Sequence, residues 1–258
     1  MKKITRILSL VLVLAMLTLA FAACGGKEPT AAEKVADAMA KIATATKTDC
    51  EATIALKVSA AGSVTQIPMT VATKVDATDA ANPTVLVETS VTIDKTAVKT
   101  SVFYKDGVAY TDANGTKTKT AISYADMISG GSTGFDTASI FAAKKDAINE
   151  SFVITENADG TISVQMAVTK AEFATALNAF ASSVAANLGS GNTAEIGDTV
   201  FNFTVDANGN ITEMTTNMTV TMKIGGETAT ATYDMTFKYN AVGDGFAVNP
   251  PADLASYK

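Results

Sequence analysis

Apolar and polar residues alternate with a period of two along most of the chain after residue 49. In the first such segment, apolar residues occupy every second position from Cys50 to Val58. The alternate positions, from Glu51 to Ser59, are mostly polar. Similar alternation recurs in six further segments: 67–75, 85–93, 98–104, 201–205, 218–224 and 229–239. Strands with one buried and one solvated face show this pattern, which is typical of antiparallel sheets. The sequence therefore predicts a long antiparallel meander.

Helical spacing interrupts the alternation at the start and in the centre. Thr30-Ala31-Ala32-Glu33 has the capping-box spacing and precedes apolar residues at helical intervals (Val35, Ala38, Met39 and Ile42), which predicts a helix of about 15 residues. Thr169 and Glu172 form a second capping box, and the segment that follows has the strongest apolar stripe in the chain, at Phe173, Leu177, Phe180, Val184 and Leu188. Two further helices are predicted at 123–128 and 135–148.

Short turn sequences separate the predicted strands. Asp106-Gly107 and Asn114-Gly115 predict tight hairpins, because these residues readily adopt positive φ angles. Asp206, Asn208 and Asn210 have the spacing that begins a calcium-binding loop, but the later glycine and glutamate of such a loop are missing. We therefore interpret 206–210 as a turn and predict no metal site.

The first residues have the layout of an export signal. Lys2, Lys3 and Arg6 are followed by an uncharged apolar run from 7 to 21 and then by Ala22-Ala23-Cys24. The run is shorter than the roughly 20 residues that a membrane-spanning helix needs. The segment 21–24 resembles the lipobox of bacterial lipoproteins, in which the cysteine receives a diacylglyceryl group and becomes the first mature residue. The alternative is an ordinary cleaved signal followed by an incidental cysteine.

These features predict three parts: a signal peptide at 1–23, a lipidated tether at 24–29 and a single domain at 30–258. Removing the signal leaves 17 basic and 26 acidic residues, a net charge of −9. This charge argues against nucleic acid and against simple electrostatic attraction to anionic lipids. We expect a monomer on the extracytoplasmic face of the cell membrane, held there by fatty acyl chains on Cys24.

The residues that are missing limit the chemistry. The chain contains no histidine and no tryptophan, and its one arginine, Arg6, lies in the signal. Ser–His and Cys–His catalysis are therefore excluded, as is bidentate guanidinium binding of phosphate. No carboxylates stand in a distinctive motif, so we predict a protein that is not an enzyme and needs no cofactor. Cys50 lies on the apolar side of its strand, where we expect it to be buried rather than reactive.

The order of elements resembles that of the LolA/LppX-like bacterial lipoproteins. Their fold is α+β, a curved antiparallel β half-barrel with helices packed over the concave face. The stretch 103–112, FYKDGVAYTD, is similar to a "YYKDG-x-x-Y" segment of the uncharacterised Gram-positive branch of this superfamily. The resemblance implies a membrane-anchored carrier of lipids. LolA proteins that transport lipoproteins carry an arginine that helps to fix the lid, and the mature chain has none, so lipoprotein-chaperone activity is not implied.

Many of the ten methionines lie on or near predicted strands, and flexible methionine suits surfaces that accept varied apolar partners. A concave apolar face beneath amphipathic helices would suit acyl chains. The predicted ligand contacts are Ile54, Leu56, Met69, Val71, Phe173, Leu177, Phe180, Met218, Met222 and Met235. The pattern alone does not separate such a cavity from a filled core. The alternative is a cell-surface scaffold or protein-interaction module without a ligand, whose partner the sequence does not identify.

Overall fold

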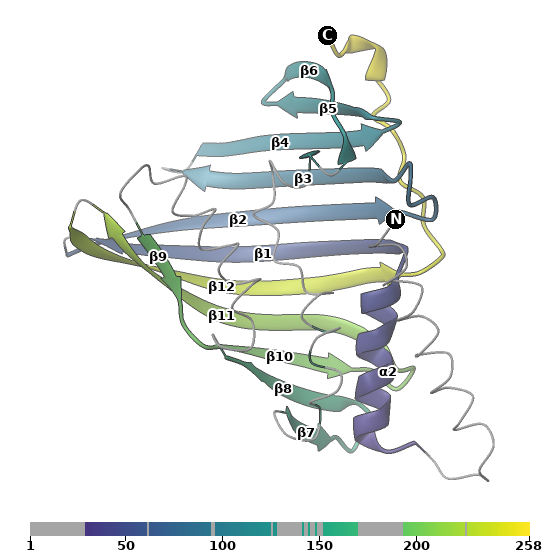
Figure 1. The fold of residues 1–258 in the computed structure, drawn as a ribbon, viewed down its shortest axis with the longest axis vertical. Coiled ribbons are helices and arrows are strands. Elements are labelled where there is room, and N and C mark those ends of the chain that lie inside the picture. Colours follow the sequence, from purple (N-terminus) through teal and green to yellow (C-terminus); the bar gives the residue numbers. More distant parts are fainter. Residues whose placement is uncertain are drawn as a thin grey trace.

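The structure of the chain is a computed structural model (Figure 1). It describes residues 29–60, 62–93, 96–124, 126, 127, 141, 144, 148, 152–169, 193–224 and 226–258. The predicted signal, the lipidation residue Cys24 and the predicted helix opened by Thr169 to Glu172 lie largely or wholly outside these residues.

Almost all of the described chain forms one antiparallel sheet. The strands of its first half are β1 (Lys47–Ala60), β2 (Ser63–Asp76), β3 (Thr84–Ile93), β4 (Thr96–Lys105), β5 (Val108–Ala113) and β6 (Thr116–Ala121). The strands of its second half are β7 (Phe152–Glu156), β8 (Ile162–Val168), β9 (Thr193–Ile196), β10 (Thr199–Val205), β11 (Ile211–Ile224) and β12 (Glu227–Val242). A short 3₁₀ helix, η2 (Leu254–Ser256), lies near the C-terminus.

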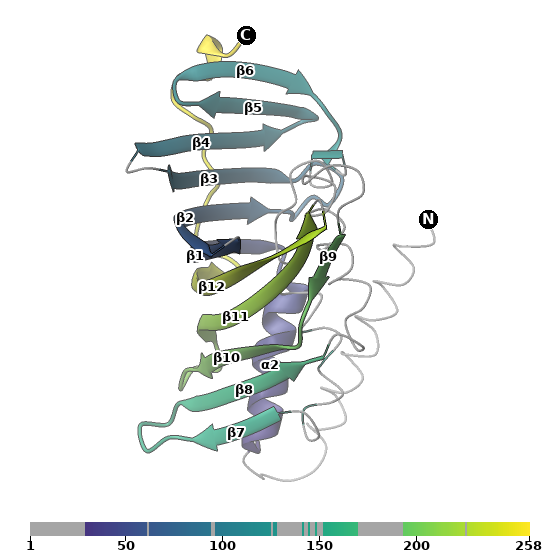
Figure 2. The same cartoon turned by 90° about the vertical axis from the view of Figure 1, so that its left-hand side faces the viewer.

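The sheet is open and curved (Figures 1 and 2). Its strand order is β6-β5-β4-β3-β2-β1-β12-β11-β10-β8-β7. The short strand β9 pairs with the C-terminal end of β11, at residues 220–223. The long central pairs join β1 to β2 and to β12, which brings the N-terminal and C-terminal thirds of the chain together. The meander predicted from the alternating pattern is confirmed. The sequence did not predict β9.

One helix is fully described, α2 (Ala31–Thr44). The Thr30 hydroxyl accepts the Glu33 backbone N–H at 3.3 Å, and the Glu33 carboxylate accepts the Thr30 N–H at 2.6 Å, which confirms the predicted capping box. The residues of α2 that are buried are the predicted apolar stripe: Val35, Ala38, Met39 and Ile42. At the other end, the Lys41 ammonium donates to the Gly209 carbonyl at 2.8 Å and so joins α2 to the β10–β11 turn.

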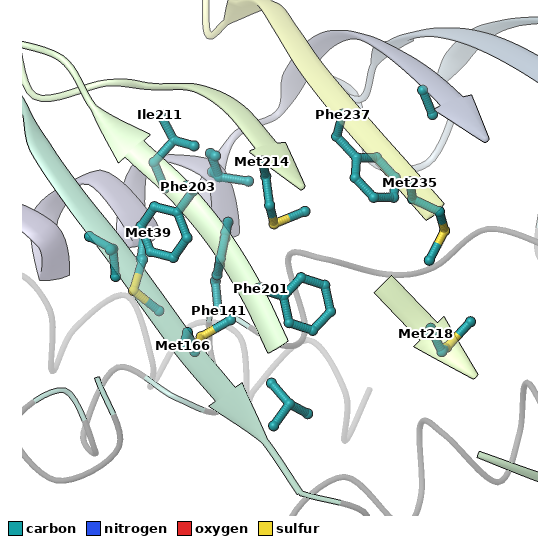
Figure 3. Close-up of a cluster of buried hydrophobic side chains, with 14 of the residues drawn as sticks. Met39, Phe141, Met166, Phe201, Phe203, Ile211, Met214, Met218, Met235 and Phe237 are labelled. Carbon is teal, nitrogen blue, oxygen red and sulfur yellow. The ribbon is translucent and has the colours of Figure 1, made fainter. Parts of the chain in front are cut away.

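The main hydrophobic core lies between α2 and one face of the sheet (Figure 3). Met39 of α2 belongs to one buried cluster with Met166, Phe201 and Phe203 from β8 and β10, and the Phe141 ring packs edge-on against Phe203 with 5.5 Å between centroids. We call the face that carries this cluster the core face and the opposite one the outer face. α2 contacts β7, β8, β10 and β11, so its cover extends over only one part of the core face.

Both predicted tight hairpins are confirmed by backbone geometry. Asp106 and Gly107 have φ angles of 51° and 77°, and Asn114 and Gly115 have 51° and 88°. The 206–210 turn closes with the Gly209 N–H donating to the Asp206 carbonyl at 2.9 Å. These turns fix the register of the strands that they join.

Candidate functional site

A row of apolar side chains crosses the core face at right angles to the strands. Strand pairing places its members directly opposite one another, in the order Phe152, Met166, Phe201, Thr216, Met235, Ile54, Met69, Val91 and Val98. Thr216 is the one polar member, and its hydroxyl donates to the Val200 carbonyl at 2.9 Å. The row therefore spans nine strands without an unsatisfied polar group.

Phe152 at one end of this row is half-buried, burial is greatest at Met166 and Phe201, and it falls from there towards Val98. Met166 and Phe201 are fully buried, and Met235 is 5% exposed. Ile54, Met69 and Val91 are half-buried, and Val98 at the end is 38% exposed. Along this row the core face thus has a sealed half on β8 and β10–β12 and a more accessible half on β1–β4. Elsewhere on the same face of β3–β5, Val85, Tyr104 and Ala109 form a second, smaller buried cluster.

We define the open strip as the half-buried or exposed apolar residues of this accessible half that neighbour the row. It comprises Ile54, Leu56, Ile67, Met69, Val71, Val91 and Val98. Leu56 and Ile67 form a second cross-strand pair beside Ile54 and Met69, so the strip is two residues wide where β1 meets β2.

The structure divides the predicted ligand contacts into three groups. Ile54, Leu56, Met69 and Val71 lie together on the open strip. Three others belong to the buried cluster of the sealed half: Met218, Met222 and Met235. The remaining three lie outside the described residues: Phe173, Leu177 and Phe180. Sequence reasoning did not select Ile67, Val91 and Val98, whose place in the strip follows from cross-strand register.

Charge is separated from the open strip by the sheet itself. On β1 and β2 every charged residue occupies an outer-face position: Lys47, Asp49, Glu51, Lys57, Lys74 and Asp76. Several of them pair across strands, as Lys74 does with Asp49 at 3.1 Å and Lys57 with Asp234 at 3.3 Å. An apolar ligand on the strip would therefore meet no side-chain charge from these two strands.

The two titratable groups beside the strip are neutral at physiological pH. Burial, followed by the charges of Asp49 and Glu51, raises the pKa of the Cys50 thiol to about 11. Burial also raises the pKa of Tyr233, which lies opposite Leu56. Cys50 is half-buried against the main core, in agreement with its predicted place on an apolar strand face. A protonated thiol is a weak nucleophile, so Cys50 does not supply reactive chemistry.

Two shallow grooves lie on the outer face, and both are polar. The larger, about 600 Å³, crosses β1–β5 beside Glu51, Glu88 and Asp112. The smaller, about 390 Å³, crosses β7, β8, β10 and β11 beside Gln165 and Asn202. No predicted ligand contact lines either groove.

The Asp206 carboxylate serves a turn. It accepts the backbone N–H groups of Asn208 and Asn210 at 2.9 and 2.8 Å. Partial burial opposes its ionisation, but these hydrogen bonds outweigh burial and lower the pKa of Asp206. Within the described residues, no group of three or more cysteine, aspartate or glutamate side chains could hold a metal ion. In that part of the chain no helix has the length and hydrophobicity needed to cross a membrane.

Comparison with solved structures finds similar sheets. LprF from Mycobacterium bovis is similar over 88% of this chain and 100% of LprF, with 15% identity and a TM-score of 0.49. A putative outer membrane lipoprotein-sorting protein domain from Vibrio parahaemolyticus is similar over 81% of this chain and 94% of that domain, with 15% identity and a TM-score of 0.27. No protein family model and no curated protein matches the chain. Because both TM-scores lie below 0.5, we draw no functional conclusion from these likenesses.

Proposed function

We propose that this chain is a membrane-anchored, extracytoplasmic lipoprotein without enzymatic activity that binds the acyl chain of a lipid along the open strip. The decline in burial along the cross-sheet row carries this proposal. If the interior were a filled core, Ile54 and Met69 would be as completely buried as Met166 and Phe201. Both are only half-buried. The predicted amphipathic helix with Phe173, Leu177 and Phe180 would supply the opposite wall over the concave side of the sheet.

The length of the strip suits a fatty acyl chain. From Ile54 to Val98 the row takes three steps between strands of about 4.8 Å, or about 14 Å in all. One leaflet of a bilayer, half of a hydrocarbon core of about 30 Å, is of the same length. A single extended acyl chain therefore fits across β1–β4.

The energetics favour a long chain over a short one. Each buried methylene contributes about 0.8 kcal/mol, and association costs an estimated 4–15 kcal/mol of lost freedom. About ten buried methylenes, or about 8 kcal/mol, are therefore needed before binding becomes appreciable. We expect ligands with chains of ten or more carbons.

The anchor is the second part of the proposal. A diacylglyceryl group on Cys24 would place the domain next to a bilayer, since the predicted tether, 24–29, is short and ends directly before Thr30. Cys24→Ala should release the protein from membranes or halt processing of the precursor. Unchanged membrane retention of this variant, or failure of radiolabelled palmitate to enter the wild-type protein in its host, would refute the anchor.

Ligand binding is tested by native mass spectrometry of the mature chain carrying Cys24→Ser, which keeps it in solution. We expect co-purified lipid on this protein and uptake of a fluorescent fatty acid. Met69→Glu places a charge on the open strip and should abolish both signals. Thr70→Glu is the matched control, because the next residue of the same strand faces outward and is exposed. It should leave both signals intact.

A protein without bound lipid that also fails to take up the fatty acid would overturn the acyl-chain proposal. Equal loss in the Met69→Glu and Thr70→Glu variants would place binding elsewhere. The alternative function, a surface scaffold or protein-interaction module, is favoured by one observation, the two polar grooves on the outer face. It predicts a chain without lipid and a partner that protects the outer face.

A further inference from the structure

The cross-sheet row stops at a free stretch of strand β4. The next strand, β5, pairs Ala113 with Thr100 and does not continue the row beyond that pair (Figure 1). One residue further on, the Lys99 N–H donates to the side-chain oxygen of Asn114 at 2.9 Å, and the Lys99 carbonyl accepts the Asn114 N–H at 3.0 Å. In the described part of the chain, no strand pairs with residues 96–98 on this side. The open strip therefore ends at an unpaired edge of the sheet.

The apolar side chains at this edge are exposed. Val98 is 38% exposed, and Ile93, which lies two residues beyond Val91 on the same face of β3, is 52% exposed. At the other end of the strip, Ile54 lies opposite Met235, which is only 5% exposed. An acyl chain buries most apolar area with its methyl end at the covered end, and a polar head loses least water at the open edge. The difference in burial thus favours one direction for a bound chain.

The absence of charge from the core face of β1 and β2 continues as far as β6. On β3–β6 every charged residue occupies an outer-face position: Glu88, Lys99, Lys105, Asp112, Lys117 and Lys119. Lys144 is the one charged side chain that is buried in the described part of the chain. It has an interaction of its own, and it lies three residues after Phe141, which packs against the sealed half. A charged head at the β4 edge would therefore lose water without gaining a counter-charge from these strands.

Two hydroxyl groups lie beside this end of the strip. Thr89 and Thr100 are directly opposite each other on β3 and β4, and each follows Val91 or Val98 at the next core-face position of its strand. Both are half-buried, and neither hydroxyl has a hydrogen-bond partner among the described residues. Neighbouring positions on one face of a strand are about 7 Å apart, so both hydroxyls are within reach of a head group whose chain follows the row. A threonine hydroxyl donates one hydrogen bond and accepts others, which suits an alcohol or an ester carbonyl.

We propose that the lipid lies with its methyl end at Ile54 and its head at the β4 edge, where Thr89 and Thr100 select an uncharged head that carries hydroxyl or ester groups. This inference rests on the proposed function, which leaves the head group and the direction of the chain undefined. The ligand class is an acyl ester of a small polyol, such as a monoacylglycerol. A fatty acid binds through the same chain but more weakly, because its carboxylate finds no counter-charge on this face.

Selection of the head is measured by competition on the mature chain carrying Cys24→Ser. Oleic acid and monooleoylglycerol share one acyl chain, and each is titrated against a bound fluorescent fatty acid. We expect the ester to bind about tenfold more tightly than the acid, which corresponds to two modest hydrogen bonds. Thr89→Val combined with Thr100→Val removes both hydroxyls at nearly constant volume, so it should abolish this preference and leave the affinity for oleic acid unchanged. Thr118→Val, on the same face of β6, is the matched control and should keep the preference.

The direction of the chain is measured independently by photolabelling. A monoacylglycerol with a diazirine at the methyl end of its chain should label β1 and β12 around Ile54 and Met235, as located by mass spectrometry of the digested protein. Label around Val98 would reverse the direction and overturn the proposal. Equal affinities for the ester and the acid, or an unchanged preference in the double variant, would also overturn it, although acyl-chain binding itself would stand. A chain that takes up neither the fluorescent probe nor either lipid would instead overturn the proposed function, and this inference with it.

Discussion

Two methionines on the same face of the sheet provide the sharpest test of its division into sealed and open halves. Met218 on β11 is 1% exposed, whereas Met69 on β2 is half-buried. Truncation of a buried methionine to alanine costs about 2–5 kcal/mol, because transfer free energy is lost and a cavity remains. We expect Met218→Ala to lower the free energy of unfolding by about 3 kcal/mol and Met69→Ala by about 1 kcal/mol.

Urea unfolding of the lipid-free chain, followed by circular dichroism, measures both changes. For a domain of about 235 residues the dependence of the unfolding free energy on urea should be near 3 kcal/mol per molar. The midpoint should then fall by about 1 M for Met218→Ala and by about 0.3 M for Met69→Ala. Equal shifts would show that Met69 is packed as tightly as Met218, and the open strip would lose its basis.

Three further predictions concern single groups. Thr30→Ala removes the N-cap of α2 and should lower the free energy of unfolding by about 1 kcal/mol, while Thr53→Ala on the exposed outer face should change it little; equal effects would contradict the cap. With its pKa raised to about 11, the Cys50 thiol should react with a thiol reagent at pH 8 on the order of a hundredfold more slowly in the native chain than in urea, and similar rates would mean that the thiol is accessible and ionised. Because the native pKa of Asp206 is lowered, its carboxylate contributes stability above about pH 4, near the unfolded value, and this contribution is lost as the pH falls through the native pKa. Asp206→Asn should therefore flatten the acid limb of a plot of stability against pH, and an unchanged limb would exclude this turn as a source of acid sensitivity.

Local rules of the sequence determined α2 and the tight turns. The capping box at Thr30 and the stripe from Val35 to Ile42 act within one helix, so spacing alone defines them. The Asp106-Gly107 turn requires positive φ angles that few residues adopt, and the sequence provides them. The alternation of β12 also predicted its buried face. Every second residue from Ala229 to Phe237 points to the same side of the strand, whatever the neighbouring strands are.

The tertiary structure alone decided how these elements combine. Cross-strand register aligned Met235, Ile54 and Met69 into one row, although they come from distant parts of the chain. Alternation gives Met69 and Met218 the same signal. Met218 belongs to the buried cluster beside α2, which contacts β7, β8, β10 and β11, whereas Met69 on β2 is half-buried, so only packing distinguishes the two methionines. The sequence of the C-terminal segment does not predict that the Tyr257 ring packs against the Tyr110 ring. The sequence thus determined which side chains share a face, because that depends on backbone period. The fold decided which of them are covered, because burial depends on segments far away in the chain.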